Sequence, residues 1–284
     1  MRVQFLGTGA SPSTPQPFCE CEACITARSA GGKNLRRRSS LIVNNDLLID
    51  LGPDVVSSSF EHGVSLVGIT HCLQTHPHGD HFDPELLISR HPEWGTRLAG
   101  PLSLAGSQAT LNALDDLCRQ RCGHGSLFDS RAQHDLKLEL TAVAPFDSCM
   151  IGSYVVTPYP ANHAAEFDAL LYTVTDGASS LFYATDTSVI ADSVWRHMSE
   201  RGVQLDVVIL DHTYGIGFES SDHLGADDFA RSVRTLKQLD ILKQGGKVYA
   251  THLSHEGIME HDAMEEFASR NEYHIAYDGL VVRV

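Results

Sequence analysis

The segment from Thr75 to His81 has the residue types and the spacing best suited to chemistry in this chain. Its members that can bind a metal ion are His76, His78, Asp80 and His81. Imidazole and carboxylate groups bind divalent transition metals well, and this set can serve two ions if the backbone turns sharply between them. Gly79 permits such a turn. The alternative, a polar loop with surface histidines, is usual for one histidine but not for three at this spacing.

Three cysteines near the start of the chain, Cys19, Cys21 and Cys24, form a second candidate metal site. Thiolates at such short separations converge easily on one tetrahedral ion, which then needs a fourth ligand from elsewhere in the chain. The chain has seven cysteines, and this odd count argues against a disulfide framework. The others are interpreted as ordinary thiols and are Cys72, Cys118, Cys122 and Cys149.

The elements that must position these residues follow a regular plan. Short segments rich in valine, isoleucine, leucine and tyrosine are expected to be strands, among them 3–6, 40–43, 47–51, 68–75, 153–159, 180–184, 205–210 and 247–251. Apolar residues at helical spacing fall at 107–121, 191–201, 226–243 and 259–270. Strands that first pair locally and later alternate with helices predict an α/β fold of four layers, an α/β/β/α sandwich.

Several candidate ligands lie near the end of an expected strand, in the segment that follows it. They are His76, His163, Asp186 and His252. Catalytic groups in α/β proteins concentrate on loops at one edge of a sheet, where a rigid scaffold fixes them and solvent can enter. We therefore expect these side chains to meet in one site.

The chain is expected to form a single domain over residues 1–284, because it contains no linker-like segment and no internal repeat. Residues 17–26 form the metal-binding loop of the cysteines within it. The least regular region, around 83–133, is interpreted as a lid or insert. No apolar run is long enough to cross a bilayer, and the start lacks the pattern of a secretory signal, so a cytoplasmic location without membrane contact is expected.

The formal net charge of -15 restricts the partners. It would repel nucleic acid polymers and anionic membranes, so an anionic substrate has to be attracted locally by metal ions or by a small basic patch. The basic run is Lys33 with Arg36, Arg37 and Arg38. Three arginines are more often a solvated edge than a binding site, although arginine suits phosphate geometry.

These features together resemble the metallo-β-lactamase superfamily. The resemblance spans nearly the whole chain and is carried by the His-x-His-x-Asp-His motif, the later His, Asp and His after strands, and the segments 6–9 and 48–52. The cysteine cluster followed by 36–40 is most similar to the PhnP-like phosphodiesterase subfamily of the carbon–phosphorus lyase pathway. That subfamily hydrolyses cyclic phosphodiesters, notably a phosphoribosyl 1,2-cyclic phosphate.

The resemblance implies a role for each candidate ligand. His76, His78 and His163 would bind a first ion, Asp80, His81 and His252 would bind a second, and Asp186 would bridge the two. Cys19, Cys21, Cys24 and His255 would bind a structural zinc. The two divalent ions of the active site are expected to be zinc or manganese, with iron and nickel also compatible with the donors. Asp50 either orients a ligand histidine or is a turn residue, and the sequence leaves both open.

The proton donor departs from the subfamily's pattern. A histidine after an Asp-x-x stretch is the general acid there, whereas residues 211–214 here read Asp-His-Thr-Tyr and place Tyr214 at the aligned position. His212, Tyr214, His223 and a metal-bound water are the candidates. His212 is preferred because imidazole titrates near neutrality. Asp80 is counted as catalytic as well as a ligand.

The predicted function is a dinuclear metal-dependent hydrolase of small cyclic phosphodiesters, in which a metal-bridging hydroxide attacks phosphorus. Hydrolysis of a lactone or thioester, or processing of a tRNA 3′ extension, stays open because one fold hosts many reactions. A non-catalytic accessory protein resembling the pyrroloquinoline quinone synthesis protein B is a further alternative, although that protein is not expected to keep the complete dinuclear set. The expected partner is a small phosphodiester, and a homodimer stays open.

Overall fold

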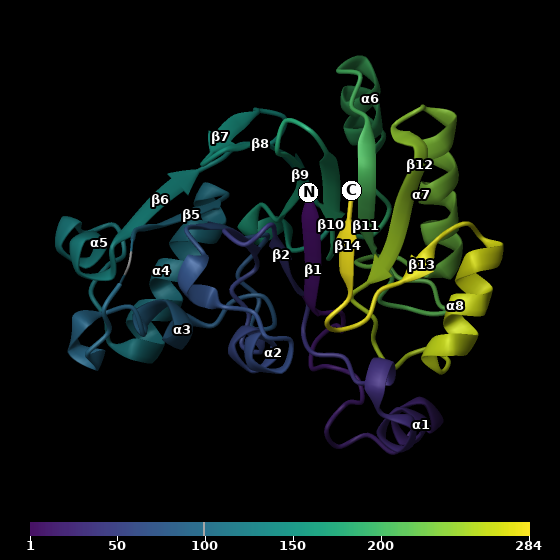
Figure 1. Cartoon of the computed structure of the whole chain (residues 1–284), viewed down its shortest axis with the longest axis horizontal. Helices are drawn as coiled ribbons and strands as arrows, with labels where there is room; N and C mark the ends of the chain where they lie inside the picture. The colour runs from purple at the N-terminus through teal and green to yellow at the C-terminus, as the bar shows by residue number, and fades with distance from the viewer. Residues whose placement is uncertain (99) are drawn as a thin grey trace.

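The computed structural model describes residues 1–98 and 100–284, which form two seven-stranded sheets (Figure 1). The first sheet has the order β14-β1-β2-β3-β4-β5-β6 and the second β13-β12-β11-β10-β9-β8-β7. The strands of the first are β1 (Arg2–Gly7), β2 (Ser40–Val43), β3 (Leu47–Ile49), β4 (His71–Leu73), β5 (Leu102–Gly106), β6 (Leu138–Ala142) and β14 (Val281–Arg283). Those of the second are β7 (Cys149–Ile151), β8 (Tyr154–Pro160), β9 (Leu170–Thr175), β10 (Ser180–Ala184), β11 (Leu205–Asp211), β12 (Leu242–Thr251) and β13 (His274–Ile275).

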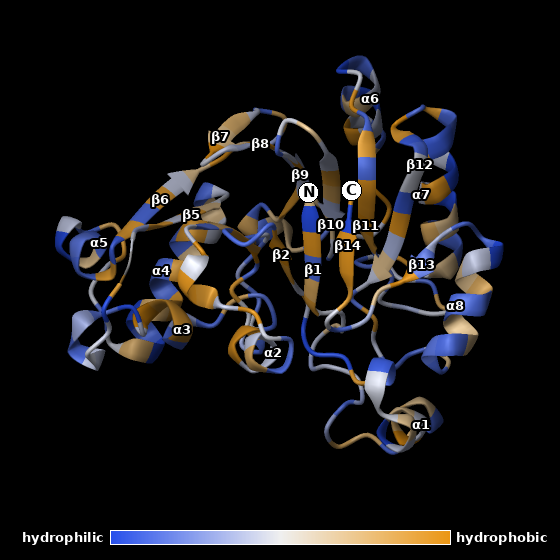
Figure 2. Ribbon diagram, in the orientation of Figure 1, coloured by the Kyte–Doolittle hydropathy of each residue, from blue (hydrophilic) through white to orange (hydrophobic). Residues whose placement is uncertain are grey.

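Three apolar clusters separate four layers. One lies between the sheets and contains Phe5 of β1 and Tyr172 of β9. The second joins the first sheet to its covering helices, which are α2 (Val55–Glu61), α3 (Pro84–Ile88), α4 (Gln108–Cys122) and α5 (Ser130–Leu136). The third joins the second sheet to α6 (Asp192–Glu200), α7 (Ala226–Gln238) and α8 (His261–Arg270). Figure 2 shows apolar strands between helices with hydrophilic outer faces, and the predicted α/β/β/α sandwich is confirmed.

The outer helices form where the sequence gives one apolar stripe and suitable ends. In α7 the buried Phe229, Val233 and Leu236 recur at helical spacing, with acidic residues in the first turn. Helix α4 begins after Ser107, whose side chain accepts a hydrogen bond from the Thr110 N–H, and it ends before a left-handed glycine. These local signals fix where each helix begins, and therefore which side chains face the sheets.

Parallel pairing gathers the strand ends that carry the candidate ligands. Strands β3, β4 and β5 pair in parallel in the first sheet, and β10, β11 and β12 do so in the second. The carboxyl ends of parallel neighbours meet at the same edge of a sheet. The loops after β3 and β4 therefore lie beside one another, as do those after β10, β11 and β12.

Some boundaries differ from the predicted ones. The expected strand 68–75 shrinks to β4 because residues 66–68 form a 3-10 turn. The expected helix 226–243 ends at Gln238, because Asp240 adopts a left-handed φ of 55° and β12 begins at Leu242. The region 83–133 contains α3, β5 and α4, and the apolar side of α4 packs into the core, while residue 99 lies outside the described residues. Its role as a lid stays a prediction.

In the part of the chain that the structure describes, no helix combines the length and the apolar composition needed to span a bilayer.

Candidate metal centre

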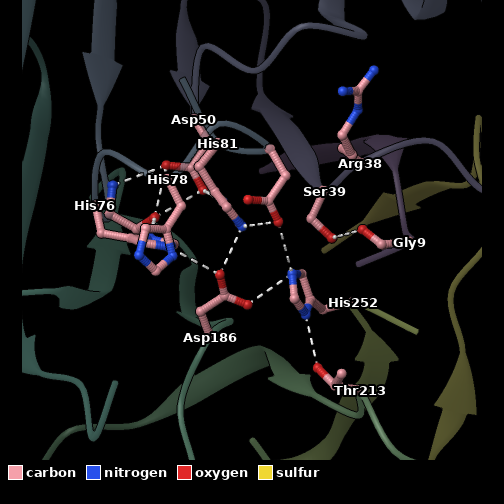
Figure 3. Close-up of polar contacts among 12 residues, drawn as sticks. Gly9, Arg38, Ser39, Asp50, His76, His78, His81, Asp186, Thr213 and His252 are labelled. Carbon is pink, nitrogen blue, oxygen red and sulfur yellow. Dashed lines mark hydrogen bonds and ion pairs between the residues drawn. The ribbon is translucent and has the colours of Figure 1, made fainter. Parts of the chain in front are cut away.

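Asp186, in the loop after β10, lies at the centre of the candidate site. Its Oδ2 is 3.1 Å from Nε2 of His76 and 2.7 Å from Nε2 of His81, both from the loop after β4. Its Oδ1 is 2.7 Å from Nε2 of His252, which follows β12. Figure 3 shows this carboxylate between the imidazoles of the two sheets. One side chain thus joins the loops of both sheets.

The candidate ligands form two groups that could each hold an ion. The ligand atoms within each group lie within 4.8 Å of one another. The first group is His76, His78 and His163, and the second is Asp80, His81, Asp186 and His252. The structure therefore brings together every residue predicted for the dinuclear site. Nitrogen and carboxylate donors of this kind suit zinc, manganese, iron or nickel.

Buried donor atoms that crowd against one another without a hydrogen bond indicate that these groups fit metal ions. Nε2 of His76, His81 and His252 and Oδ1 of Asp186 are buried and make no hydrogen bond. Buried polar atoms in folded proteins nearly always have a partner, so such atoms gathered at one point need an explanation. A divalent cation at each group would satisfy them, and the cluster fits a metal-dependent hydrolase.

The carboxylates shift the pKa values of the two histidines in the second group. Burial opposes the charged form, but the negative charges of Asp186, Asp80 and Asp50 raise the pKa of His81 above its ordinary value. In the same way Asp186 outweighs burial and raises the pKa of His252 to about 10. Both imidazoles therefore hold protons that a cation must displace, and metal affinity should increase with pH.

A ring of hydrogen bonds around the ligands fixes their orientation. Asp50 accepts hydrogen bonds from Nδ1 of His81 at 2.8 Å and from the N–H of Thr75 at 2.8 Å, which leaves Nε2 of His81 to face the centre. Oγ1 of Thr213 lies 2.8 Å from Nδ1 of His252 and acts on that ring in the same way. Asp50 thus orients a candidate ligand, which is one of the two roles that the sequence left open for it. Thr213 could not be recognised from the sequence, because threonines are common at strand ends.

The backbone at three of these residues is left-handed. The φ angles of Asp50, Asp186 and His252 are 65°, 55° and 60°. Residues other than glycine adopt such angles rarely, and they cost free energy that the surroundings must offset. Asp50 and His252 directly follow β3 and β12, and Asp186 is the second residue after β10, so a sharp reversal after each strand aims the side chain at the centre.

His223, in the loop before α7, completes the site with a second acidic partner. Its Nδ1 lies 2.9 Å from Oδ2 of Asp211 and 3.1 Å from Oγ1 of Thr213. Burial opposes protonation, but Asp211 raises the pKa of His223 above its ordinary value. The ring stacks on that of His252, with centroids 5.4 Å apart. Because Nδ1 is engaged by Asp211, Nε2 is the ring nitrogen left for the open cavity that His223 lines.

The structure corrects the preference for His212 as proton donor. His212 is buried, its Nε2 lies 3.2 Å from the Tyr273 hydroxyl, and its ring packs on Phe229. Side chains alternate between faces along an extended chain, so Asp211 and Thr213 face the site while His212 faces the helices. Burial also lowers the pKa of His212 to about 4. Tyr214, a further candidate, does line the cavity.

The cysteine cluster meets its predicted fourth member. Nδ1 of His255 lies 3.4 Å from Sγ of Cys19 and 3.3 Å from Sγ of Cys21, and Cys24 completes a group whose ligand atoms are within 4.8 Å of one another. Cys21 immediately precedes α1 (Glu22–Ala30), and its hydrogen bond to His255 lowers the pKa of its thiol to about 6. Three thiolates and one imidazole fit a closed tetrahedral zinc site.

The three consecutive arginines donate hydrogen bonds to other residues of the chain. Arg36 is buried and donates to Oγ1 of Thr8, the Ala276 carbonyl and Nδ1 of His261. Arg37 donates to Glu61, and Arg38 makes a two-pronged pair with Asp54 at 2.7 Å for each bond. Arg36 is therefore no solvated edge, whereas Arg37 and Arg38 stay partly exposed in ion pairs, and none of the three lines the cavity.

An open cavity lies over the metal centre and is bounded by both sheets' loops. It is lined by Ala10, Ser11, His78, Asp80, His163, Asp186, Thr213, Tyr214, His223, His252, Ser254 and Glu256.

Comparisons with known proteins agree with this geometry. Residues 45–253 match the family model of the beta-lactamase superfamily domain. A stretch of 59 residues is 41% identical to coenzyme PQQ synthesis protein B of Bradyrhizobium diazoefficiens, a match that covers only 19% of this chain and 19% of that protein.

Two solved structures are similar over nearly their whole length. A diphosphatase from the PhnP family has a TM-score of 0.70 and 22% identity, covering 99% of this chain and 97% of its own. Zinc-bound PqqB from Methylobacterium extorquens has a TM-score of 0.73 and 17% identity, with all of both chains covered. At these identities the likeness is one of fold.

Proposed function

The chain belongs to the beta-lactamase superfamily, and from this premise we propose that it is a dinuclear metal-dependent phosphodiesterase. The single observation that carries the proposal is the position of Asp186. Its Oδ2 is 3.1 Å from Nε2 of His76 in the first ligand group, and its Oδ1 is 2.7 Å from Nε2 of His252 in the second. Paired sites of this kind suit displacement at phosphorus, where both the attacking and the departing oxygen need support.

The ligands would hold the ions as their donors allow. His76, His78 and His163 would bind one, Asp80, His81 and His252 the other, with Asp186 between them. When bound, two divalent ions polarise phosphoryl oxygens and lower the pKa of water toward neutrality. Asp50 and Thr213 hold His81 and His252 in the ring orientation that this binding requires.

His223 is the proposed proton donor. Its Nδ1 is engaged by Asp211 at 2.9 Å, which leaves the Nε2 proton for the oxygen of the departing alcohol. A general acid must be protonated at the working pH, and Asp211 raises the pKa of His223 in that direction. Substrate therefore enters between the ligand groups and the Asp211–His223 pair.

A second candidate is a role in cofactor synthesis. The match to coenzyme PQQ synthesis protein B and the fold shared with zinc-bound PqqB favour it. Against it stands the complete set of ligands in both groups. Hydrolysis of a phosphodiester by the purified protein decides between the two.

The test measures metal content and turnover together. Purified protein is expected to contain two ions beyond the structural zinc and to hydrolyse bis(p-nitrophenyl) phosphate, but not a lactone or a thioester. Asp186→Ala should lose the two ions and the turnover, while Asp116→Ala, on the exposed face of α4, should lose neither. Protein that binds no metal at this centre, or that hydrolyses the lactone in preference to the diester, would contradict the proposal.

A further inference from the structure

The wall of the cavity beyond the ligands is polar, and its basic member is the proposed proton donor His223. Its non-ligand members include Ser11, Tyr214, Ser254 and Glu256, and among the described residues that line it there is no lysine or arginine. The metal-binding residues Asp186 and His252 also line the cavity, and Oδ1 of Asp186 lies 2.7 Å from Nε2 of His252 at its base. A ligand's single anionic group therefore has its place at the metal centre, and the wall offers no second one.

The nearby arginines do not supply a second anion site. Arg38 is paired with Asp54, and its hydrogen bonds to this carboxylate are the main reason that the pKa of Arg38 is raised. Arg36 is buried and donates hydrogen bonds to neutral acceptors, and it does not line the cavity. The net charge of -15 adds a general repulsion of further anions.

Two exposed carboxylates lie in or beside the cavity: Glu256 in its lining and Asp222 next to the lining residues His163 and His223. Glu256 lines the cavity with an exposed side chain. The carboxylate of Asp222 is also exposed and lies within 4.8 Å of ring nitrogens of His163 and His223. Carboxylates accept hydrogen bonds from hydroxyl groups, and the Tyr214 and serine hydroxyls can exchange them in either direction.

Close backbone packing fixes this rim. The Gly215 N–H donates to the Glu256 carbonyl at 3.0 Å, and a Cβ on Gly215 would meet the Gly257 carbonyl oxygen at 1.8 Å. The Glu256 N–H donates to Oγ of Ser254 at 3.1 Å. Glu256 and Tyr214 therefore cannot easily separate to admit a cation or a second phosphate.

We infer that the substrate is a phosphodiester of an otherwise uncharged, hydroxyl-bearing alcohol, such as a sugar or nucleoside without a further phosphate. This inference rests on the proposed function and narrows it. A second phosphate would lie beside Glu256 and Asp222, and no lysine or arginine among the described residues lines the cavity to offset the repulsion. Hydroxyl groups would instead donate to the two carboxylates. The phosphoribosyl 1,2-cyclic phosphate suggested by the family resemblance, which carries an additional phosphate, is thereby disfavoured relative to its unphosphorylated counterpart.

The test uses two ligands that differ in one phosphate. Adenosine 2′,3′-cyclic phosphate and its 5′-phosphorylated counterpart are compared as competitive inhibitors of bis(p-nitrophenyl) phosphate hydrolysis, so that each is measured whether or not it is itself hydrolysed. We expect the unphosphorylated ligand to bind about tenfold more tightly or better. Raising the ionic strength should reduce this preference, because salt screens exposed charges.

A charge reversal at the rim identifies the cause. Glu256→Lys should abolish or reverse the preference, and Glu256→Gln should reduce it. Glu200→Lys makes the same change at the end of α6, just before the start of β11, whereas the cavity lies at the end of β11. This control should leave the preference intact.

The outcomes separate the two proposals. Equal binding of the two ligands, tighter binding of the phosphorylated one, or no binding of either, by protein that hydrolyses bis(p-nitrophenyl) phosphate, would overturn the inference and leave the proposed function standing. Failure to hydrolyse any phosphodiester would overturn both.

Discussion

The proposed dinuclear centre and the cysteine cluster differ in how the protein supports them. The first takes ligands from several loops, and its donors His76, His81 and Asp186 are buried and mostly held by hydrogen bonds to neighbouring side chains. The second takes thiolates from one surface loop, and Cys21 is exposed. The contacts that join that loop to His255 are sulfur–nitrogen contacts at 3.3 and 3.4 Å. The protein therefore preforms one site, and the ion itself must hold the other together.

The two sites are linked through one short segment. His252 and His255 lie three positions apart after β12, and the intervening Leu253 N–H donates to the Thr8 carbonyl at 2.9 Å. The Ala10 N–H donates back to the Leu253 carbonyl at 3.1 Å. The N-terminal segment thus packs against the segment 252–255 by backbone pairing, and the cysteine loop extends from the N-terminal segment.

Metal removal should have the largest effect and should show most clearly how the two sites differ. A chelator should reduce phosphodiester turnover to the background of metal-free solution, because both ligand groups would be empty. The histidine signals of the dinuclear centre in an NMR spectrum should keep their dispersion, whereas the loop 17–26 should become sensitive to protease. Collapse of both regions together would show that the buried centre is not preformed.

Replacing His223 should have the next largest effect. His223→Asn is expected to lower kcat about a hundredfold or more for a substrate with an alkyl leaving group. With p-nitrophenolate as leaving group the loss should be much smaller, since that anion needs no proton. His212→Asn is the contrasting variant and should reduce stability through its buried ring while changing kcat little; the opposite pattern would restore His212 as the donor.

Weakening the support of the buried centre should have an intermediate effect. Asp50→Asn keeps the shape of the side chain but removes the charge that faces Nδ1 of His81. Metal affinity at the second group should fall about 10- to 100-fold, as is usual when a partner of a metal-binding histidine is lost. Titration with zinc or manganese, using turnover as the readout, measures it. Unchanged affinity would mean that Asp50 serves only the turn.

Breaking the surface site should alter turnover least among these variants. Cys21→Ser removes an exposed thiolate, and we expect a several-fold loss of turnover with release of one zinc ion and a lower Tm. Ser29→Ala, in the exposed end of α1, is a matched control that leaves the zinc in place. Full retention of zinc and Tm in Cys21→Ser would show that the cluster closes without this thiol.

The smallest expected effect concerns pH. Burial, followed by the charge of Arg36, lowers the pKa of His261 from 6.5 to about 4. Between these values the unfolded chain binds a proton that the folded chain excludes, so the free energy of unfolding falls as pH decreases from 6.5 toward 4. His261 contributes at most about 1.4 kcal/mol per pH unit to that slope. His261→Gln should flatten the slope in urea titrations, and an unchanged slope would contradict this account.

The candidate metal ligands were predictable because they either belong to the His-x-His-x-Asp-His motif or follow a strand rich in apolar residues, a pattern that resembles a known family. His76, His163, Asp186 and His252 needed only the expectation that strand ends share one edge. The proton donor was not predictable in this way. Whether His212 or His223 faces the site depends on side-chain alternation after Asp211 and on the return of a loop, and neither is visible in residue spacing.

The roles of Asp50 and the arginines also needed the three-dimensional structure. Asp50 lies 31 positions before the His81 that it orients, so only the pairing of β3 with β4 brings them together. Arg36 is buried by residues from the far end of the chain, including His261. A run of basic letters does not reveal such partners.

The separation of Cys19 from His255 has a consequence for biosynthesis. The two residues lie 236 positions apart. A ribosome adds about 5 to 20 residues each second, so the three thiols leave it roughly 10 to 50 seconds before their imidazole partner exists. During that interval they are open to oxidants and to competing metals. A chain that ends before residue 255 would leave the three thiols open to oxidants and competing metals permanently. These cysteines would distinguish it from the chain that contains His255.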